Sequence, residues 1–272
     1  MEVGVISKRL EEQVGEREIL AAVFTTYVFD PLFFELEVIS LLLDNKHPSY
    51  VNDSLVKQYL VRDELRKSGM PIEVFYDAPM FAKEQLNSPQ MDYLFHGVDL
   101  RGPAFHPKLI FLLVKNDKGE EKLLIAAGSN NLTYAGWWDN IECQHWVELG
   151  YHDTQRYDLD RFVACLNYLK SKGRQLDENK ENRRAINKIL KYLDECKGNN
   201  KKGYLCFYGP YDNKIPKIDF LSYLKNPAEL LHSGSTWKVE IISPFFADDV
   251  NNTLHDNFLK DPKVKSSLYL PQ

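Results

Sequence analysis

Cysteine is scarce in this sequence, and no two cysteines lie close together. The four cysteines are Cys143, Cys165, Cys196 and Cys206, and no C-x-x-C pair occurs. Zinc sites and disulfide frameworks are normally recognised by closely spaced or regularly repeated cysteines, so the sequence indicates neither of them. We expect reduced thiols with a structural role, as in a cytoplasmic protein.

Long apolar runs and an excess of positive charge are also absent. No apolar run approaches the roughly 20 residues that cross a bilayer, and segment 1–20 is charged throughout and lacks the apolar centre of a signal peptide. The net charge of −5 gives no general attraction to nucleic acid or to anionic membranes, so phosphate binding requires a local site. The sequence predicts a soluble, cytoplasmic protein without a membrane partner.

The first part of the chain alternates between strand and helix patterns. With 272 residues and 44% apolar composition, the chain has room for one large α/β domain, or for a domain and part of another. Breaks at Asp30-Pro31 and Gly69 separate the apolar segments. The patterns predict a strand over 19–29, a helix after Pro31, a second helix that begins at Asp53 or Ser54, and a strand over 71–78.

Segment 80–103 has few periodic signals, and we predict a long surface loop there. It is followed by "KLIFLLV" and "EKLLIAAG", two apolar runs joined by "KNDKGEE", which predict a buried antiparallel hairpin. "IECQHWVELGY" predicts a further strand. Apolar stripes at helical spacing then predict helices within segment 153–196.

The end of the sequence resembles a second beginning. Segment 236–272 has the order strand, Pro-Phe-Phe-Ala-Asp turn, helix and short strand, as segment 19–78 has. The predicted organisation is a first half over 1–200 and the start of a second half over 201–272.

Polar residues lie at one end of the predicted hairpin. His106 and Lys108 are two residues apart at the head of the first run, so in a strand their side chains share a face. A neutral imidazole can attack phosphorus, and an ammonium can bind the non-bridging oxygens. Ser129 and Asn131, after the second run, are further hydrogen-bond donors, and Glu142 is a candidate to orient the imidazole.

Each of these features also has a plain structural interpretation. H-x-K at a strand start is usually a surface pair, G-S-N-N is usually a turn, and Glu142 fits a solvent-facing strand position equally well. Trp137 and Trp138 fit core or lid positions. His145 and His152 have no metal-ligand spacing and are interpreted as structural. Together, the pair and the cluster favour a phosphate site.

The ordered set His106-Pro107-Lys108, Gly128-Ser129-Asn130-Asn131 and Asn140-Ile141-Glu142 resembles the signature of the phospholipase D superfamily. That superfamily usually has an aspartate five positions after the lysine, where this chain has Leu113. The pattern is similar to the variant of the tyrosyl-DNA phosphodiesterase branch, in which an asparagine replaces that aspartate. The resemblance covers about forty residues with specific motifs, and less specific similarity extends to the segments around them.

The resemblance implies a mixed β-sheet flanked by helices, an α/β sandwich repeated about a pseudo-twofold axis. The active site lies between two halves that each supply an H-x-K, and it uses no metal or other cofactor. His106 is implied as the nucleophile that forms a phosphohistidine, and Lys108 and Asn131 as phosphate ligands. Ser129 is implied as an auxiliary donor and Glu142 as the orienting carboxylate.

The sequence contains one H-x-K. The chain is therefore part of a longer two-half enzyme, a subunit of a homodimer that brings two copies of His106 together, or a half-site with little activity. The apparent restart in segment 236–272 favours the first of these.

The predicted function is a metal-independent phosphodiesterase whose partner is DNA or a DNA-linked adduct. A non-catalytic nucleic-acid-binding or assembly module of the same fold is the first alternative. A phospholipid-processing enzyme is the second, and the absence of interfacial apolar segments disfavours it.

Overall fold

A computed structural model describes residues 4–43, 53–81, 92–151, 159–174, 181, 184–197, 237–242 and 264–269. The chain divides into two compact units, Met1–Cys206 and Phe207–Gln272. Within the described ranges, every helix is too short or too polar to cross a membrane.

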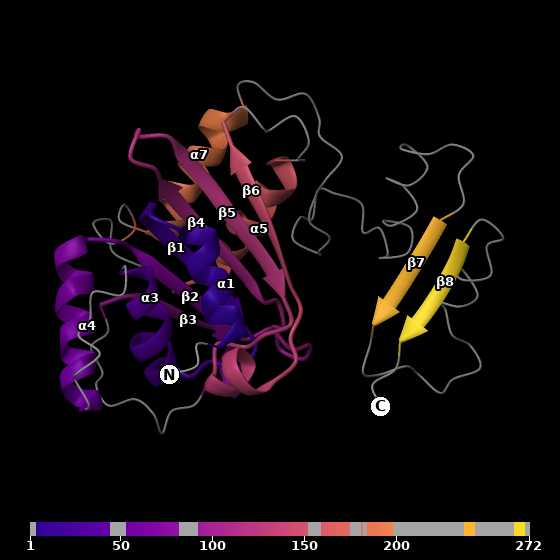
Figure 1. Cartoon of the computed structure of the whole chain (residues 1–272), viewed down its shortest axis with the longest axis horizontal. Coiled ribbons are helices and arrows are strands. Elements are labelled where there is room, and N and C mark those ends of the chain that lie inside the picture. The colour runs from indigo at the N-terminus through magenta and orange to yellow at the C-terminus, as the bar shows by residue number, and fades with distance from the viewer. Residues whose placement is uncertain are drawn as a thin grey trace. The chain divides into compact units, whose positions relative to one another are not determined.

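The first unit is built on a six-stranded mixed sheet with the order β3-β2-β1-β4-β5-β6 (Figure 1). β1, β2 and β3 run parallel, and β4, β5 and β6 continue the sheet in antiparallel steps from β1. The expected α/β class with a mixed sheet and flanking helices is confirmed. The strands are β1 (Glu18–Thr26), β2 (Ile72–Asp77), β3 (Leu94–Val98), β4 (Leu109–Lys115), β5 (Glu121–Gly128) and β6 (Gln144–Gly150).

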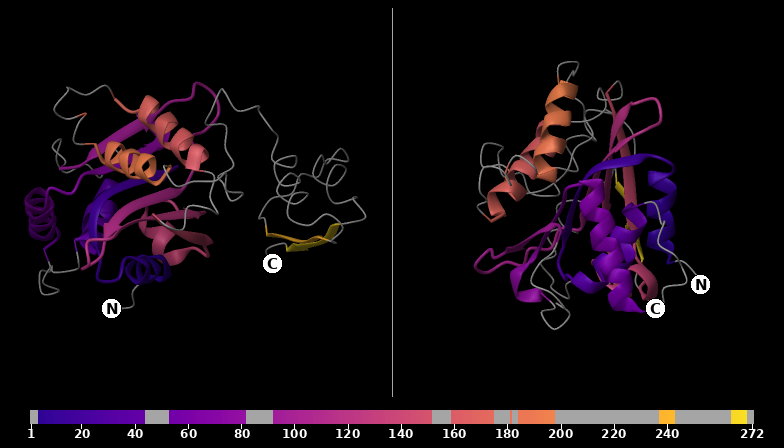
Figure 2. Two further views of the ribbon diagram at one scale, coloured as in Figure 1. Left: turned by 90° about the horizontal axis from the view of Figure 1, so that it is seen from above. Right: turned by 90° about the vertical axis from the view of Figure 1, so that its left-hand side faces the viewer.

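Helices cover both faces of this sheet, as Figure 2 shows from above and from the side. α5 (Leu159–Lys172) and α7 (Ala185–Lys197) pack together on one face, where α7 contacts β1, β2 and β4. Six further helical elements contribute to the core of the opposite face. They are α1 (Val5–Val14), α2 (Pro31–Phe33), the π-helical η1 (Phe34–Ile39), α3 (Ser40–Leu42), α4 (Ser54–Ser68) and the π-helical η4 (Ala135–Asp139).

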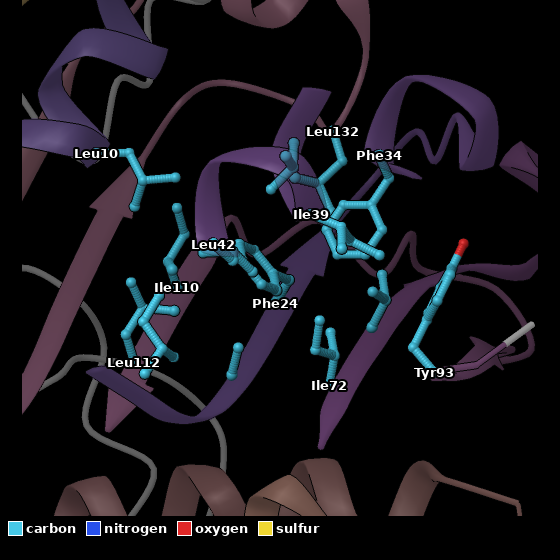
Figure 3. Packing of buried hydrophobic residues seen from close by; sticks show 14 of the residues in the cluster. Leu10, Phe24, Phe34, Ile39, Leu42, Ile72, Tyr93, Ile110, Leu112 and Leu132 are labelled. Carbon is cyan, nitrogen blue, oxygen red and sulfur yellow. The ribbon is translucent and has the colours of Figure 1, made fainter. Parts of the chain in front are cut away.

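The larger apolar core lies between the sheet and this second group of helices. Figure 3 shows strand residues such as Phe24 and Ile110 against helix residues such as Phe34 and Ile39, and all four are buried. Alternate residues of each strand face this core, and the intervening ones face α5 and α7. Both faces of the central strands are therefore buried, which explains why β4 is apolar from Leu109 to Val114.

The boundaries of α4 agree with its predicted caps. The Asp53 carboxylate accepts the backbone N–H groups of Leu55 (2.8 Å) and Val56 (3.3 Å), and Gly69 ends the helix in a left-handed conformation, with φ of 63°. The helix predicted after Pro31 is also present, as the consecutive segments α2, η1 and α3.

The prediction of a continuous surface loop over segment 80–103 was wrong, because β3 lies within it. β3 is an edge strand that pairs with β2 alone, and its residue His96 is buried with 1% exposure. A strand whose inward-facing residues include a histidine gives no apolar alternation, so the pattern that reveals a strand is missing. η2 (Ala78–Met80) precedes the undescribed part of this segment.

In the second unit, β7 (Trp237–Ile242) and β8 (Val264–Tyr269) form a parallel pair. β1 and β2 are also successive strands that pair in parallel. If segment 236–272 repeats the start of the first unit, its two strands should pair in the same way, as β7 and β8 do. The helix predicted between them lies outside the described residues, and the start of a second half stays a prediction.

Candidate active site

The predicted site residues of the hairpin gather at one end of the sheet. The carboxyl ends of β1 and β2, the start of β4 and the end of β5 lie there, because β4 runs antiparallel to both β1 and β5. His106 and Lys108 precede β4, and Ser129 and Asn131 follow β5. The sheet topology thus brings together residues that lie more than twenty positions apart in sequence.

Three hydrogen bonds hold the backbone that carries His106 and Lys108. The Phe105 N–H donates to Oδ2 of Asp77 (2.6 Å), and the Leu109 N–H donates to Oγ1 of Thr25 (2.8 Å). The carbonyl of Lys108 accepts the N–H of Gly128 (3.0 Å). The H-x-K segment is therefore fixed by β1, β2 and β5, although it precedes the first residue of a strand.

The side chains of His106 and Lys108 converge, as the spacing predicts. Nζ of Lys108 lies 3.0 Å from Nδ1 and 3.3 Å from Nε2 of His106. The ring of Tyr27, just after β1, lies 4.6 Å from the His106 ring between centroids and 5.9 Å from Nζ of Lys108. An ammonium, an imidazole and an aromatic ring thus form one contiguous group, in which His106 is exposed and Lys108 is half-buried.

The surroundings shift both ionisable groups toward their neutral forms. Burial lowers the pKa of Lys108 from 10.5 to about 8, and the Glu142 carboxylate opposes this shift. Burial, followed by the charge of Lys108, lowers the pKa of His106 below its usual 6.5, and the Asp77 carboxylate opposes that shift. Near pH 7, His106 is therefore largely neutral, as a nucleophile must be, while Lys108 is largely charged.

Ser129 and Glu142 contact each other. The Ser129 hydroxyl donates to Oε2 of Glu142 and accepts the Cys143 N–H (2.9 Å), and the Asn140 amide donates to Oε1 of Glu142 (3.3 Å). Each oxygen of Glu142 thus already accepts a hydrogen bond. Within the described residues, the predicted hydrogen bond between Glu142 and the imidazole is not formed, and Glu142 acts instead on the Ser129 hydroxyl and on the charge of Lys108.

Asn131 connects its loop to the end of β1. Its Oδ1 accepts the Val28 N–H (3.2 Å) and lies 3.4 Å from the Thr26 hydroxyl. The same hydroxyl accepts the Leu132 N–H (3.0 Å). Because the side-chain oxygen of Asn131 is used in this way, its amide nitrogen is the donor that remains for a ligand.

Gly128 is required by close packing in this loop. A Cβ atom there would lie 2.6 Å from Oδ1 of Asn130 and 3.0 Å from the Cys143 carbonyl oxygen. Any larger residue would push the G-S-N-N loop away from the start of β6, and with it Ser129.

The sequence interpretation missed Asp77, Thr25 and Tyr27. Asp77 is the last residue of β2 and is 6% exposed. The available signal was position: polar residues at the carboxyl ends of two adjacent parallel strands meet at one edge of a sheet. Of the predicted structural residues, Trp137 is a core residue, His145 is exposed on β6, and His152 lies outside the described residues.

The described residues contain no group of three or more histidine, cysteine or acidic side chains able to hold a metal ion. Comparison with protein-family models gave no match to this chain. Comparison with curated proteins also gave no match. The chemistry of the site must therefore be argued from its own residues.

Proposed function

We propose that the chain is the first half of a metal-independent phosphodiesterase of the phospholipase D type, acting on DNA or on a DNA-linked adduct. The observation that carries the proposal is the contact between His106 and Lys108, 3.0 Å between Nδ1 and Nζ. Ser129 and Asn131 lie on the loop that follows the adjacent strand β5. The proposal includes the fold: a phospholipase D-like sandwich with a pseudo-symmetric second half.

The proposed reaction begins with attack by a ring nitrogen of His106 on phosphorus. The nitrogen lone pair forms the N–P bond, and the bond between phosphorus and the leaving oxygen breaks with its electron pair on that oxygen. Lys108 and the Asn131 amide hold the non-bridging oxygens, and the Ser129 hydroxyl donates to them after its single proton turns away from Glu142. Water then attacks phosphorus and gives its proton to solvent or to the group that protonated the leaving oxygen, while the N–P bond breaks and its electron pair returns to His106.

The leaving oxygen of a natural diester also needs a proton. In the proposed two-half enzyme, the histidine of a second H-x-K supplies it, either from a second half or from a homodimer partner. A substrate whose leaving group departs without being protonated therefore tests the first half by itself. The p-nitrophenyl ester of thymidine 5′-phosphate, radiolabelled at phosphorus, releases a phenolate anion and meets this requirement.

We expect this ester to transfer its label to the protein in the presence of EDTA. The expected adduct is acid-labile and alkali-stable, as a phosphohistidine is, and denaturing electrophoresis of samples kept at alkaline pH detects it. A protein that stays unlabelled, or that is labelled only when a divalent metal is added, contradicts the proposal.

The presence of a single H-x-K favours a second candidate, a nucleic-acid-binding module without turnover. In that case, the protein stays unlabelled and binds a single-stranded oligonucleotide with an affinity that falls as salt rises. Lys108→Ala then weakens binding.

The two lowered pKa values predict a bell-shaped pH profile. The rate of nitrophenolate release, measured as kcat/KM, should rise as His106 loses its proton below pH 6.5. It should fall through about pH 8, where Lys108 loses its proton and its charge. Lys108→Arg should remove the alkaline fall, because a guanidinium keeps its charge. Lys122→Arg is the matched control, since Lys122 pairs with Glu148 on β6. An alkaline fall that persists in Lys108→Arg would show that another group titrates there.

A further inference from the structure

Asp77 is a buried carboxylate at the edge of the proposed site. It ends β2, is 6% exposed, and accepts the Phe105 N–H with Oδ2 at 2.6 Å. Phe105 is itself 2% exposed and directly precedes His106. Asp77 therefore determines where the backbone enters the H-x-K segment.

The negative charge of Asp77 needs a separate explanation. Burying a carboxylate costs more than burying a neutral acceptor, and an asparagine or serine could accept the same N–H. The cost of burying a charge at this position is offset only if the charge interacts with another group. The H-x-K pair lies at this end of the sheet, and the charge of Asp77 acts on its imidazole.

Two side chains act on the charge of His106, and two others contact its ring or act on Lys108. Lys108 disfavours the protonated imidazole, Asp77 favours it, and the ring of Tyr27 packs against it. Glu142 acts on Lys108, and its oxygens accept from Ser129 and Asn140. Asp77 is thus the carboxylate that acts on the imidazole at this site.

We propose that Asp77 is the positioning residue of His106: it fixes the backbone before the histidine, and its charge stabilises the imidazole when that ring becomes cationic. The second part rests on the proposed function, because attack on phosphorus gives the imidazole a positive charge until it loses its remaining proton. The first part stands on the hydrogen bond to Phe105.

The test compares Asp77→Asn with Asp99→Asn. Asp99 is the matched control, because its Oδ1 accepts a backbone N–H from Arg101 (2.8 Å) in the same connection between β3 and β4. The histidine ring protons are titrated by NMR, and the spectrum of His106→Ala identifies the His106 signals. In Asp77→Asn, we expect the titration midpoint of His106 to fall by about 0.5 pH unit, the size of a solvent-screened charge interaction.

In Asp99→Asn, the midpoint should stay at the wild-type value. Equal midpoints in the two variants would overturn the proposal. If Asp77→Asn does not fold, Asp77→Ser gives the same comparison, since its hydroxyl can accept the Phe105 N–H without a charge.

Labelling by the nitrophenyl ester separates this proposal from the proposed function. Slower labelling in Asp77→Asn, with an unchanged rate in Asp99→Asn, supports both. A shifted midpoint with no labelling of the wild-type protein retains the effect of the Asp77 charge on His106 and rejects the phosphodiesterase. Labelling at the wild-type rate in Asp77→Asn rejects the positioning role in the reaction.

Discussion

His106→Ala should abolish covalent labelling by the nitrophenyl ester and lower turnover by at least about 10³-fold, as expected when a nucleophile is removed. His106 is the imidazole in contact with Lys108, which places it where a nucleophile is required. Its side chain is exposed, so its removal leaves no cavity and should leave the fold intact. Labelling is measured by electrophoresis, turnover by nitrophenolate release, and folding by circular dichroism.

His145→Ala is the matched control for this variant. His145 is also an exposed histidine, on β6 opposite Ala127 of β5. His145→Ala should be labelled to the wild-type extent and should release nitrophenolate at the wild-type rate. Label that persists in His106→Ala would show that another residue is the nucleophile, and loss of label in both variants would point to a general effect on the protein.

Glu73→Gln should lower the free energy of unfolding by about 3–5 kcal/mol, the usual cost of breaking a buried ion pair by removing one partner. Glu73, on β2, is 0% exposed, and the guanidinium of Arg184, which precedes α7, binds it through Nη2 (2.8 Å) and Nε (3.1 Å). The Ile186 N–H donates to the same carboxylate (3.1 Å). The variant would leave the Arg184 charge buried without its partner on β2.

The same network includes His96 of β3. Its Nδ1 accepts the Arg174 N–H (3.1 Å), so its proton lies on Nε2, 3.3 Å from the Glu73 carboxylate. Burial raises the pKa of Glu73, but the hydrogen bonds from His96, Arg184 and Ile186 outweigh it, and the pKa lies below 4.5. This stabilisation is therefore complete above about pH 4.5 and is lost as the pH falls through the lower folded-state pKa.

Glu148→Gln is the matched control, because Glu148 is also a paired carboxylate, bound by Arg17 and Lys122, but is exposed on β6. Its loss should cost less than about 1 kcal/mol. Urea unfolding at pH 7 measures both variants. Similar small losses in the two would show that the buried network does not hold α7 to the sheet.

The double variant Glu73→Gln, Arg184→Met tests the interaction itself. It should lose less free energy of unfolding than the two single variants lose in sum, because removing the second partner relieves an uncompensated charge. Additive losses would contradict an interaction between the two side chains.

The sequence predicts the hairpin and the convergence of His106 with Lys108 because both depend on local periodicity. β4 and β5 are apolar runs around a turn, and two-residue spacing places side chains on one face of an extended segment. The caps of α4 are local for the same reason.

The parts that the sequence does not predict depend on distant contacts between polar groups. Glu73 in "IEVFYD" reads as an exposed position of an alternating strand, and nothing nearby shows that Arg184, 111 residues later, neutralises it. His96 depends on the same interaction. Asp77 and Phe105 are 28 residues apart, and Glu142 takes partners other than the expected imidazole.

The hydrogen bond between Leu109 and Thr25 spans 84 residues, and this has a consequence for the order of folding. The hairpin of β4 and β5 can form from neighbouring sequence, but His106 is held in place only after that hairpin pairs with β1. Contacts of such long sequence separation form slowly, since closing the loop costs entropy before any contact compensates it. A ribosome-bound chain must therefore expose β4 before His106 and Tyr27 can meet, and the hairpin alone does not assemble the site.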